Sequence, residues 1–517
     1  MGKYREALEL IKKENPFPAV CGRICPRGCE SECTRGDIDQ PLAVDEIKKF
    51  IADKELHEAT RFVPKKMHDY GKKIAVVGAG PAGLSCAYYL SIDGYKVTVF
   101  EKQQKLGGML TLGIPAFRLE KDVVNAEIDI LREMGVEFKT GVEVGKDVTI
   151  PELRKQGYEG FYLAIGAQGG RKLGLEGEDA KGVIAGVEFL RDVNLGKEVK
   201  LKGNVIVIGG GNVAIDVART AVRSDAKQVE MYCLESRAEM PALDEEVEEA
   251  LSEGIVINNS WGPKRIVVEG GKVKGVEFKR CVAVFDQNGK FNPRYDLNDT
   301  KFVEADFVLL SVGQSIEWGG LLEGTKVVLN PNRTAHADGF TYQTAEPDIF
   351  VGGDAFTGPK YAIDAIAAGK QGAISLHRFV QPGQSLVFGR DRREYKMFDK
   401  DNLVVEGYDN TPRQQAGHTP AENRKSFKDT RLTFTEEQMK KETERCLGCG
   451  AVQVDEYKCV GCGVCTTRCM FEAITLRKVK DAWGSEFETL PLKVAPYMAK
   501  RVSKIAVKTV KNVLGVK

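Results

Sequence analysis

The chain has 517 residues, 42% of them hydrophobic, and its 75 Lys and Arg residues nearly balance 74 Asp and Glu residues, for a formal net charge of +1. This length predicts three or four domains with ample core, and the neutral balance argues against a general nucleic-acid binder. No apolar run reaches the roughly 18 residues that span a bilayer, and the charged start lacks the apolar region of a secretory signal. We therefore expect a cytoplasmic protein that is not an integral membrane protein.

The first 70 residues are charged and helix-like, and they carry four cysteines at regular four-residue intervals. These are Cys21, Cys25, Cys29 and Cys33, in CGRICPRGCESEC. In a reducing compartment clustered thiols stay free to ligate, so the set favours a metal site over disulfides. The spacing alone does not identify the metal, and structural or zinc-bound thiols are the alternative to an iron–sulfur cluster.

From Lys72, the sequence KKIAVVGAGPAGLSCAYYLSIDGYKVTVFE predicts a strand, a glycine turn, a helix and a second strand. Gly78, Gly80 and Gly83 form a G-x-G-x-x-G pattern that brings a pyrophosphate close to the backbone N–H groups of the turn. Glu101 follows 23 residues after Gly78, where it can accept hydrogen bonds from ribose hydroxyls. The unit predicts a dinucleotide site, and a glycine turn without a ligand is the alternative.

A second unit of the same plan begins at Asn204, about 130 residues later, as NVIVIGGGNVAIDVARTAVRSDAKQVEMYCLE. Its pattern is the G-x-G-x-x-A variant, formed by Gly209, Gly211 and Ala214. Its acidic candidate is Glu235, which favours the free 2′-hydroxyl of NAD and repels the 2′-phosphate of NADP. We therefore expect NAD to be preferred over NADP, although Arg223 and Arg237 lie near enough in sequence to reach a 2′-phosphate. The alternative is that Glu235 is a solvated surface charge with no role in binding.

Beyond the second unit, Gly-Gly and Asn-Gly turns predict hairpins within RIVVEGGKVKGVEFKRCVAVFDQNGKF. ADFVLLSVGQ predicts another buried strand, and PDIFVGGDAFTGPKYAIDAIAAGKQGAISLHRFV predicts a strand, a turn and a helix. Residues 381–440 are polar and lack periodicity, which predicts a long connector. The last 25 residues hold seven cations and no acids, which predicts a solvated helical face. The alternative is a helix that docks on an acidic partner or a membrane surface.

Cys459, Cys462, Cys465 and Cys469 follow the C-x2-C-x2-C-x3-C spacing of bacterial ferredoxins, which wraps three thiolates around the corners of a [4Fe–4S] cube. Zinc usually binds two separated pairs of cysteines, so it is the less favoured occupant of this site. Cys446 and Cys449 stand just upstream, and Cys469 could instead serve a second cube with them. Six cysteines cannot fill two cubes, so we expect one cluster here and about two in the chain.

Together these patterns predict an α/β protein with two Rossmann-like dinucleotide-binding domains, a helical N-terminal iron–sulfur cap and a small C-terminal ferredoxin-like domain. The expected segments are a helical iron–sulfur domain (1–70), the first part of one dinucleotide fold (71–195), a second dinucleotide fold (196–330), the rest of the first fold (331–385), a connector (386–440), a ferredoxin-like [4Fe–4S] domain (441–480) and a basic tail (481–517).

Two dinucleotide folds, with the second inserted before a closing GGD strand, resemble the pyridine-nucleotide:disulfide oxidoreductase superfamily. GGMLTLGIPAFRLEKDVVNAEIDILREMGVEF, GGGNVAIDVARTAVR and the MPA at residues 240–242 are similar to the glutamate synthase small-subunit family. The resemblance covers about residues 15–385. It implies FAD in the first fold and NAD(P)H in the second. No cysteine pair lies in KLGGMLTLGIPAF, where the disulfide reductases carry theirs, so thiol exchange is not the expected chemistry.

The resemblance also implies the residues of each site. Those expected at FAD are Gly78, Gly80, Pro81, Ala82, Gly83, Glu101, Gly108, Met109, Arg118, Ala164, Gly166, Gly353, Asp354 and Ala362. Those expected at NAD(P) are Gly209, Gly211, Asn212, Val213, Ala214, Arg223, Glu235 and Gly313. The N-terminal cysteines are similar to the second half of the family's iron–sulfur domain, and because the cysteine group of its first half is not expected here, we expect one cluster rather than two in this region.

The expected function is that of an iron–sulfur flavoprotein enzyme that moves electrons between NAD(P)H, FAD and [4Fe–4S] clusters. No protein acid or base is expected at the reacting carbon, because hydride transfer to a flavin needs only stacking and orientation. The expected partners are ferredoxin or the other redox subunits of a complex, and this complex includes the electron-bifurcating kind. A stand-alone NAD(P)H:ferredoxin oxidoreductase and a non-catalytic assembly subunit are the alternatives.

Overall fold

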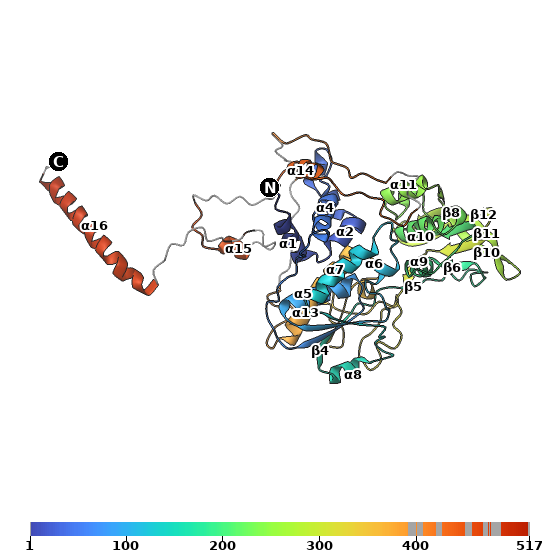
Figure 1. The fold of residues 1–517 in the computed structure, drawn as a ribbon, viewed down its shortest axis with the longest axis horizontal. Coiled ribbons are helices and arrows are strands. Elements are labelled where there is room, and N and C mark those ends of the chain that lie inside the picture. The colour runs from blue at the N-terminus through green and yellow to red at the C-terminus, as the bar shows by residue number, and fades with distance from the viewer. Residues whose placement is uncertain are drawn as a thin grey trace. The chain divides into compact units, whose positions relative to one another are not determined.

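The computed structural model describes residues 2–390, 400, 407–419, 426–449, 458–468, 474, 476 and 487–514 (Figure 1). The chain divides into two compact units, each considered by itself. The first contains Met1–Arg390 and Met397–Cys449, and the second contains Asp391–Lys396 and Gly450–Lys517. The first unit holds an N-terminal helical region and two α/β folds.

The N-terminal region is built from short helices, as its charged, strand-poor sequence predicts. These are α1 (Tyr4–Glu14), α2 (Pro18–Ile24), α3 (Gly28–Ser31), the 3₁₀ helix η1 (Thr34–Asp37) and α4 (Val44–Leu56). Helix α2 approaches α4 closely at Gly22, where an added Cβ would lie 2.7 Å from the Cα atom of Lys49. Cys21, on the same turn of α2, is thereby fixed beside α4.

The first α/β fold is a five-stranded parallel sheet of order β15-β4-β1-β2-β3. Its strands are β1 (Lys73–Val77), β2 (Lys96–Glu101), β3 (Glu137–Thr140), β4 (Tyr158–Leu163) and β15 (Ile349–Val351). Its helices are α5 (Pro81–Asp93), α6 (Met109–Leu112), α7 (Lys121–Glu133), α8 (Ile150–Lys155), α12 (Asp354–Thr357) and α13 (Ala362–Val380). Helices α5 and α13 lie side by side (Figure 1), and they meet at Gly369, where a Cβ would lie 2.3 Å from the carbonyl oxygen of Ala82.

The second α/β fold is inserted between β4 and β15 and repeats the parallel plan with the order β6-β13-β7-β8-β9. Its strands are β6 (Val183–Ala185), β7 (Gly203–Ile208), β8 (Ala226–Tyr232), β9 (Val256–Asn258) and β13 (Phe307–Leu310). Its helices are α9 (Gly186–Asn194), α10 (Asn212–Val222) and α11 (Asp244–Ser252), with the 3₁₀ turn η2 (Arg237–Glu239). Both dinucleotide folds predicted from the sequence are therefore confirmed.

An antiparallel sheet covers part of the second fold, as the Gly-Gly and Asn-Gly turns predict. It consists of β10 (Trp261–Glu269), β11 (Lys272–Phe285) and β12 (Phe291–Glu304). The rings of Tyr232 and Phe278 stack at 4.1 Å and join this sheet to the end of β8. A separate two-residue pairing of β5 (Gly169–Gly170) with β14 (Gln314–Ser315) lies where the chain enters and leaves the second fold.

Residues 407–419 and 426–449 belong to the first unit, within a stretch that the sequence predicts to be a connector as far as residue 440. Helix α14 (Glu436–Glu444) lies beside α4 (Figure 1), and Phe434 and Met439 join a hydrophobic cluster with residues of α1 and α4. The polar residues of this stretch pair with the N-terminal region, which explains their lack of periodicity. The division between units falls after Cys449, later than the predicted start of the ferredoxin-like segment at 441.

Buried charges fix this contact. Arg431 binds Asp45 at 3.2 Å, and the ammonium of Lys49 donates to the carbonyl of Arg431 at 2.6 Å. The fully buried guanidinium of Arg445 binds Glu442 at 2.8 Å and Asp39 at 3.1 Å. Because an unpaired buried charge is costly, each of these residues holds the C-terminal stretch on the N-terminal helices.

In the second unit, the described elements are α15 (Val464–Arg468), the 3₁₀ turn η4 (Phe487–Thr489) and α16 (Leu490–Val513). Nearly half of the predicted ferredoxin-like domain (441–480) lies outside the described residues, so its fold stays a prediction. Across the described residues, no helix combines the length and the apolar character that a membrane span requires.

Candidate active site

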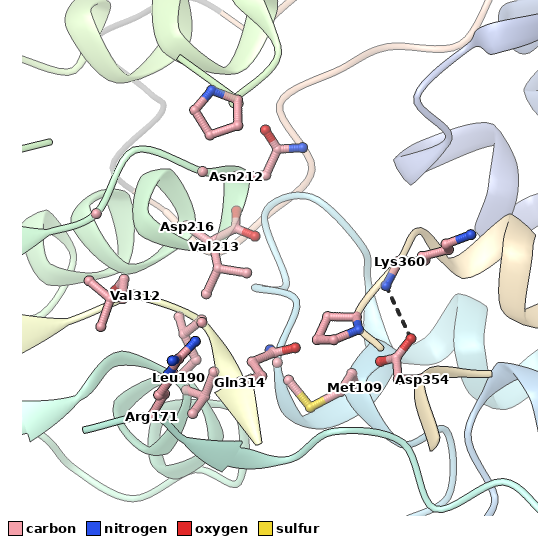
Figure 2. Close-up of a pocket in the computed structure, with 18 of the residues that line it drawn as sticks. Met109, Arg171, Leu190, Asn212, Val213, Asp216, Val312, Gln314, Asp354 and Lys360 are labelled. Carbon is pink, nitrogen blue, oxygen red and sulfur yellow. Dashed lines mark hydrogen bonds between the residues drawn. The ribbon is translucent and has the colours of Figure 1, made fainter. Parts of the chain in front are cut away.

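A cavity of about 1310 Å³ lies where the carboxyl ends of both parallel sheets meet. In open α/β sheets this edge is where ligands bind. Figure 2 shows Met109 and Asp354 of the first fold on one side and Asn212 and Val213 of the second fold on the other, with Gln314 between them. One cavity therefore joins the two predicted nucleotide sites.

The first glycine loop requires the absence of side chains. Gly78 has φ +104°, and an added Cβ would lie 2.4 Å from the carbonyl oxygen of Ala164. At Gly83 a Cβ would lie 2.0 Å from the carbonyl oxygen of Gly78, so any side chain at this position would prevent the start of α5 from packing against the glycine loop. Gly80 caps α5, and Gly80, Pro81 and Ala82 line the cavity, so the N-terminal end of this helix borders it, an arrangement that suits a pyrophosphate.

Glu101 ends β2 in the cavity wall and is only 3% exposed. Its carboxylate accepts hydrogen bonds from the backbone N–H groups of Ala79 and Gln103, each at 2.8 Å. Burial raises the pKa of this carboxyl, and the hydrogen bonds oppose the rise. The acid is thus fixed at the edge of the glycine loop before any ligand binds.

The predicted flavin end of the cavity is formed by two further glycine-rich turns. At Gly108 (φ +53°) a Cβ would lie 2.7 Å from the Cα atom of Gly80, so the two loops touch. Asp354 opens α12, and its carboxylate accepts the backbone N–H of Lys360 at 3.2 Å (Figure 2). Burial raises the pKa of Asp354 from 3.8 to about 6. The chemistry fits FAD, because a polar acceptor and glycine backbone line a space that side chains would fill.

The second glycine loop repeats this geometry. Gly209 has φ +144°, and an added Cβ would lie 2.4 Å from the carbonyl oxygen of Ser311. Gly211 caps α10, and Asn212 accepts the backbone N–H of Leu243 at 2.9 Å through its side-chain oxygen. These glycines leave room for a second pyrophosphate at the start of α10.

Glu235 lies beyond β8 in the wall of the same cavity. One of its carboxylate oxygens would lie 2.8 Å from a Cβ placed on Gly210, so the acid sits against the glycine loop. Burial raises the pKa of this carboxyl. Arg237, the nearby alternative for a phosphate, binds Asp244 at 2.8 Å.

Nearly all of the predicted nucleotide-site residues line the cavity. From the first fold these are Gly78, Gly80, Pro81, Ala82, Glu101, Gly108, Met109, Arg118, Ala164, Gly166, Gly353, Asp354 and Ala362, and from the second Gly209, Gly211, Asn212, Val213, Glu235 and Gly313. Gly83 and Ala214 lie behind the loops, where they let each helix pack closely.

Arg223 differs from its prediction as a cofactor residue. It follows α10 at the end away from the glycine loop, and its guanidinium binds Glu253 at 2.6 Å. The same guanidinium lies 4.0 Å from the centre of the Phe117 ring. Sequence proximity to Glu235 is misleading here, because a helix of three turns separates Arg223 from the cavity.

Sequence reasoning missed an ionic contact between the two folds. Arg118 of the first fold binds Asp216 on α10 at 2.7 Å and also Glu246 on α11. All three side chains are largely buried, and burial raises the pKa of Glu246 although Arg118 opposes the rise. Arg118 thus lies in the cavity wall, as the resemblance implies, but its charge belongs to the interface between the folds.

The N-terminal cysteines lie within one small helical region. Burial is the main cause that raises the pKa of Cys21 to about 12 and that raises the pKa of Cys29, and the charge of Cys25 acts in the same direction on both. The ammonium of Lys48 lies near enough to oppose both shifts. Four thiols with an adjacent cation have the chemistry that an anionic iron–sulfur cluster needs. Among the described residues, however, no three His, Cys, Asp or Glu side chains lie close enough together to hold a metal ion.

The C-terminal cysteines are divided between the units. Cys446 and Cys449 are exposed thiols that follow α14 in the first unit. Cys459, Cys462 and Cys465 are exposed in the second unit, the last of them on α15. Cys469, the fourth member of the predicted run, lies outside the described residues.

Comparison with known proteins agrees with this architecture. Residues 72–369 match the family described as "Pyridine nucleotide-disulphide oxidoreductase", and residues 1–60 match "Dihydroprymidine dehydrogenase domain II, 4Fe-4S cluster". The chain is therefore an oxidoreductase of the pyridine nucleotide-disulphide oxidoreductase family, with an N-terminal 4Fe-4S domain. FprA of Mycobacterium tuberculosis, solved in complex with NADPH, shares the fold, with a TM-score of 0.52 and 19% identity over 60% of this chain and 84% of that protein.

Curated relatives narrow the assignment. The glutamate synthase [NADPH] small chain of Escherichia coli is 35% identical over 74% of this chain and 84% of its own length. The NADP(+)-dependent formate dehydrogenase subunit beta of Moorella thermoacetica is 34% identical over 87% of this chain and 67% of its own. The NADPH-Fe(3+) oxidoreductase subunit beta of Geobacter sulfurreducens is 32% identical over 86% of this chain and 71% of its own length. The chain belongs with the glutamate synthase small chains and these beta subunits, as its motifs indicate.

Proposed function

We propose that this chain oxidises NADH with FAD and passes the electrons through [4Fe–4S] clusters to a partner redox subunit or ferredoxin, or runs this path in reverse. The cavity carries the proposal, because both glycine loops open into one space. A nicotinamide bound to the second fold and a flavin bound to the first can then approach each other without passing through solvent.

The chain's residues would bind and orient rather than exchange protons. FAD, when bound, supplies the conversion between the two-electron chemistry of nicotinamide and the one-electron chemistry of clusters. Glu101 would hold the adenosine ribose, Asp354 the ribityl chain, and the Gly80 turn the pyrophosphate. Met109 and Gln314 stand where the two ligands would meet (Figure 2).

The cysteines would carry the electrons onward. The N-terminal four would hold one cluster, and the run from Cys459 to Cys469 would hold another. Several relatives are named as subunits, which supports a partner subunit as the terminal donor or acceptor. Free thiols at this density persist in a reducing compartment, so we place the protein in the cytoplasm.

We propose a preference for NADH over NADPH, although the relatives' names refer to NADP or NADPH. Glu235 supports this preference, because its carboxylate lies in the cavity wall beside the second glycine loop. A 2′-phosphate there would meet a negative charge, whereas a 2′-hydroxyl could donate a hydrogen bond. Arg237, which follows Glu235 closely, is bound to Asp244, and Arg223 is bound to Glu253 at the end of α10 away from the cavity.

The test is an anaerobic titration of purified protein. We expect flavin and about two clusters' worth of iron and sulfide, with flavin absorbance bleached at lower concentrations of NADH than of NADPH. Absence of flavin, or zinc in place of iron, would contradict the proposal. Reduction of ferredoxin by the purified chain alone would assign the terminal acceptor to a soluble carrier rather than a partner subunit.

Exchanging Glu235 for Arg tests the cofactor preference. We expect the ratio of kcat/KM for NADH to that for NADPH to fall by about tenfold or more, which corresponds to about 1.4 kcal/mol. Glu248→Arg makes the same charge change on the exposed face of α11 and should leave the ratio unchanged. An unchanged ratio in Glu235→Arg would remove this residue from cofactor selection without affecting the wider proposal.

A further inference from the structure

Helix α16 of the second unit has one strongly charged stripe. It spans Leu490–Val513 and carries six cations and no acid: Lys493, Lys500, Arg501, Lys504, Lys508 and Lys511. At 3.6 residues per turn, these six side chains fall within an arc of about 100°. The uncompensated charge favours an anionic surface as the binding partner.

Most of the remaining side chains of the helix are apolar, and several of them are exposed. Leu492, Val502, Ile505, Val507 and Val510 are between 55% and 78% exposed in this unit. Monomeric proteins seldom leave so continuous an apolar strip open to water, and such strips mark interaction sites. The arc of apolar residues is about twice as wide as the cationic stripe.

Two hydroxyl side chains interrupt the apolar arc, but neither needs water. The hydroxyl of Ser503 donates to the carbonyl of Lys500 at 3.0 Å, and that of Thr509 donates to the carbonyl of Ile505 at 2.9 Å. Because the helix backbone accepts both hydrogens, the whole arc can enter an apolar medium without leaving a hydroxyl donor unpaired.

This geometry suits a lipid surface better than a protein groove. A groove takes a narrow stripe of anchors at i, i+3, i+4 and i+7, whereas an interfacial helix buries a wide apolar face and keeps its lysines among lipid headgroups. The long lysine stems can extend from the edge of the stripe toward the phosphates. The helix does not meet the requirements of a membrane span.

We propose that α16 is a membrane-surface anchor that lies flat on an anionic bilayer, with its apolar arc in the acyl boundary and its six cations at the headgroup phosphates. The second unit would thereby bring the chain's ferredoxin-like cysteine run to the membrane surface. This proposal does not depend on the nucleotide chemistry of the first unit.

The experiment is co-flotation of the full-length protein with vesicles. We expect the protein to float with phosphatidylcholine vesicles that contain phosphatidylglycerol, and at least about tenfold less with phosphatidylcholine alone, because each basic residue contributes to binding an anionic surface. High salt should reduce the binding.

Two variants separate the charged stripe from the apolar arc. Lys500→Glu/Lys504→Glu/Lys508→Glu should abolish flotation, and Val502→Ser/Ile505→Ser should weaken it by about tenfold, because less apolar surface is buried. The matched control Lys146→Glu/Lys197→Glu/Lys200→Glu changes the same charge at exposed sites of the first unit and should float like wild type. Flavin content should be unchanged in every variant, which shows that the first unit is folded.

Failure of the wild-type protein to float with anionic vesicles would overturn the proposal. Equal flotation of the α16 charge variant and the wild type would overturn it as well. Self-association that requires α16, seen by sedimentation without vesicle binding, would assign the apolar arc to a second copy of the chain. Binding only to an acidic redox partner would assign it to a protein surface.

Discussion

Glu101 and Glu235 are the acids at the carboxyl ends of β2 and β8, the strands that follow the glycine-loop helices α5 and α10, and their surroundings differ. The Glu101 carboxylate is bound by two backbone N–H groups of the first fold and is almost fully buried. The Glu235 carboxylate lies in the cavity wall against Gly210. The acid of the first fold is thus held by its own backbone, which suits the resident FAD that we propose there. The acid of the second fold faces the cavity, which suits the exchangeable nicotinamide nucleotide that we propose there.

The strongest test of this comparison places the same substitution in both glycine loops. Gly78→Ala and Gly209→Ala each put a Cβ 2.4 Å from a carbonyl oxygen at a residue with positive φ. We expect Gly78→Ala to be isolated with little or no FAD. Gly209→Ala should retain FAD, and its KM for NADH should rise by about tenfold or more, since a backbone clash there costs over about 1.4 kcal/mol.

Flavin absorbance per protein and steady-state kinetics measure the two effects. Gly339→Ala is the control, because Gly339 has no atom within 4 Å of an added Cβ, and it should match wild type in both. Loss of FAD from Gly209→Ala with retention in Gly78→Ala would reverse the assignment of the two folds.

The contact between the folds gives the next largest expected effect. Arg118→Ala leaves the buried carboxylates of Asp216 and Glu246 without their cation, which typically costs about 3–5 kcal/mol. We expect the second fold to be held less firmly and flavin bleaching by NADH to slow by about tenfold at unchanged flavin content. Stopped-flow mixing measures the rate, and Arg118→Lys should recover part of it.

A control variant separates this effect from general destabilisation. Arg154→Ala breaks a pair with Asp348 that lies wholly within the first fold, so it should lower thermal stability without slowing the bleaching. Equal slowing by Arg154→Ala and Arg118→Ala would mean that stability, not the contact between the folds, sets the rate.

The smallest expected effect concerns the C-terminal ends of α5 and α10. The end of α10 carries Arg219 and Arg223, both bound to Glu253, whereas α5 ends in Asp93, a charge that the helix dipole disfavours. Burial raises the pKa of Asp93 from 3.8 to about 6. Between these pH values the folded protein keeps a proton that the unfolded chain has lost, so stability falls as pH rises through about 6.

Asp93→Asn removes this dependence. We expect the variant to be more stable than wild type above pH 6, by about 1–2 kcal/mol once partial solvent exposure is allowed for, and the difference to vanish near pH 4. Thermal unfolding across this pH range measures it. A variant that is less stable than wild type at neutral pH would show that favourable contacts of the Asp93 carboxylate, such as the attraction of His68 that opposes the rise of its pKa, outweigh its burial.

The sequence predicts those features that have a local pattern. Alternation and glycine spacing specify β1, α5, β7 and α10, and the positive φ values of Gly78 and Gly209 follow from those motifs. Thus both glycine loops and their acids could be located from the residues alone.

Long-range charge pairing has no such pattern. Arg118 and Asp216 are 98 positions apart, and Arg431 and Asp45 are 386 apart, so neither pair could be inferred from spacing. Residues 426–440 look like a polar connector because their charged side chains pair with residues near the other end of the chain, as Arg431 does with Asp45 and Asp429 with Lys49. Arg223 differs from its prediction for the same reason: its partner Glu253 follows 30 positions later, on the turn after α11.

The insertion of the second fold between β4 and β15 has a consequence for biosynthesis. Strand β15, Asp354 and α13 are translated only after the whole second fold, although they complete the site that the Gly78 loop begins. Domains generally fold as they leave the ribosome, so the second fold can form on the nascent chain while the first fold still lacks β15 and α13. Capture of a flavin at the site that we propose in the first fold must therefore wait until about residue 380 has emerged.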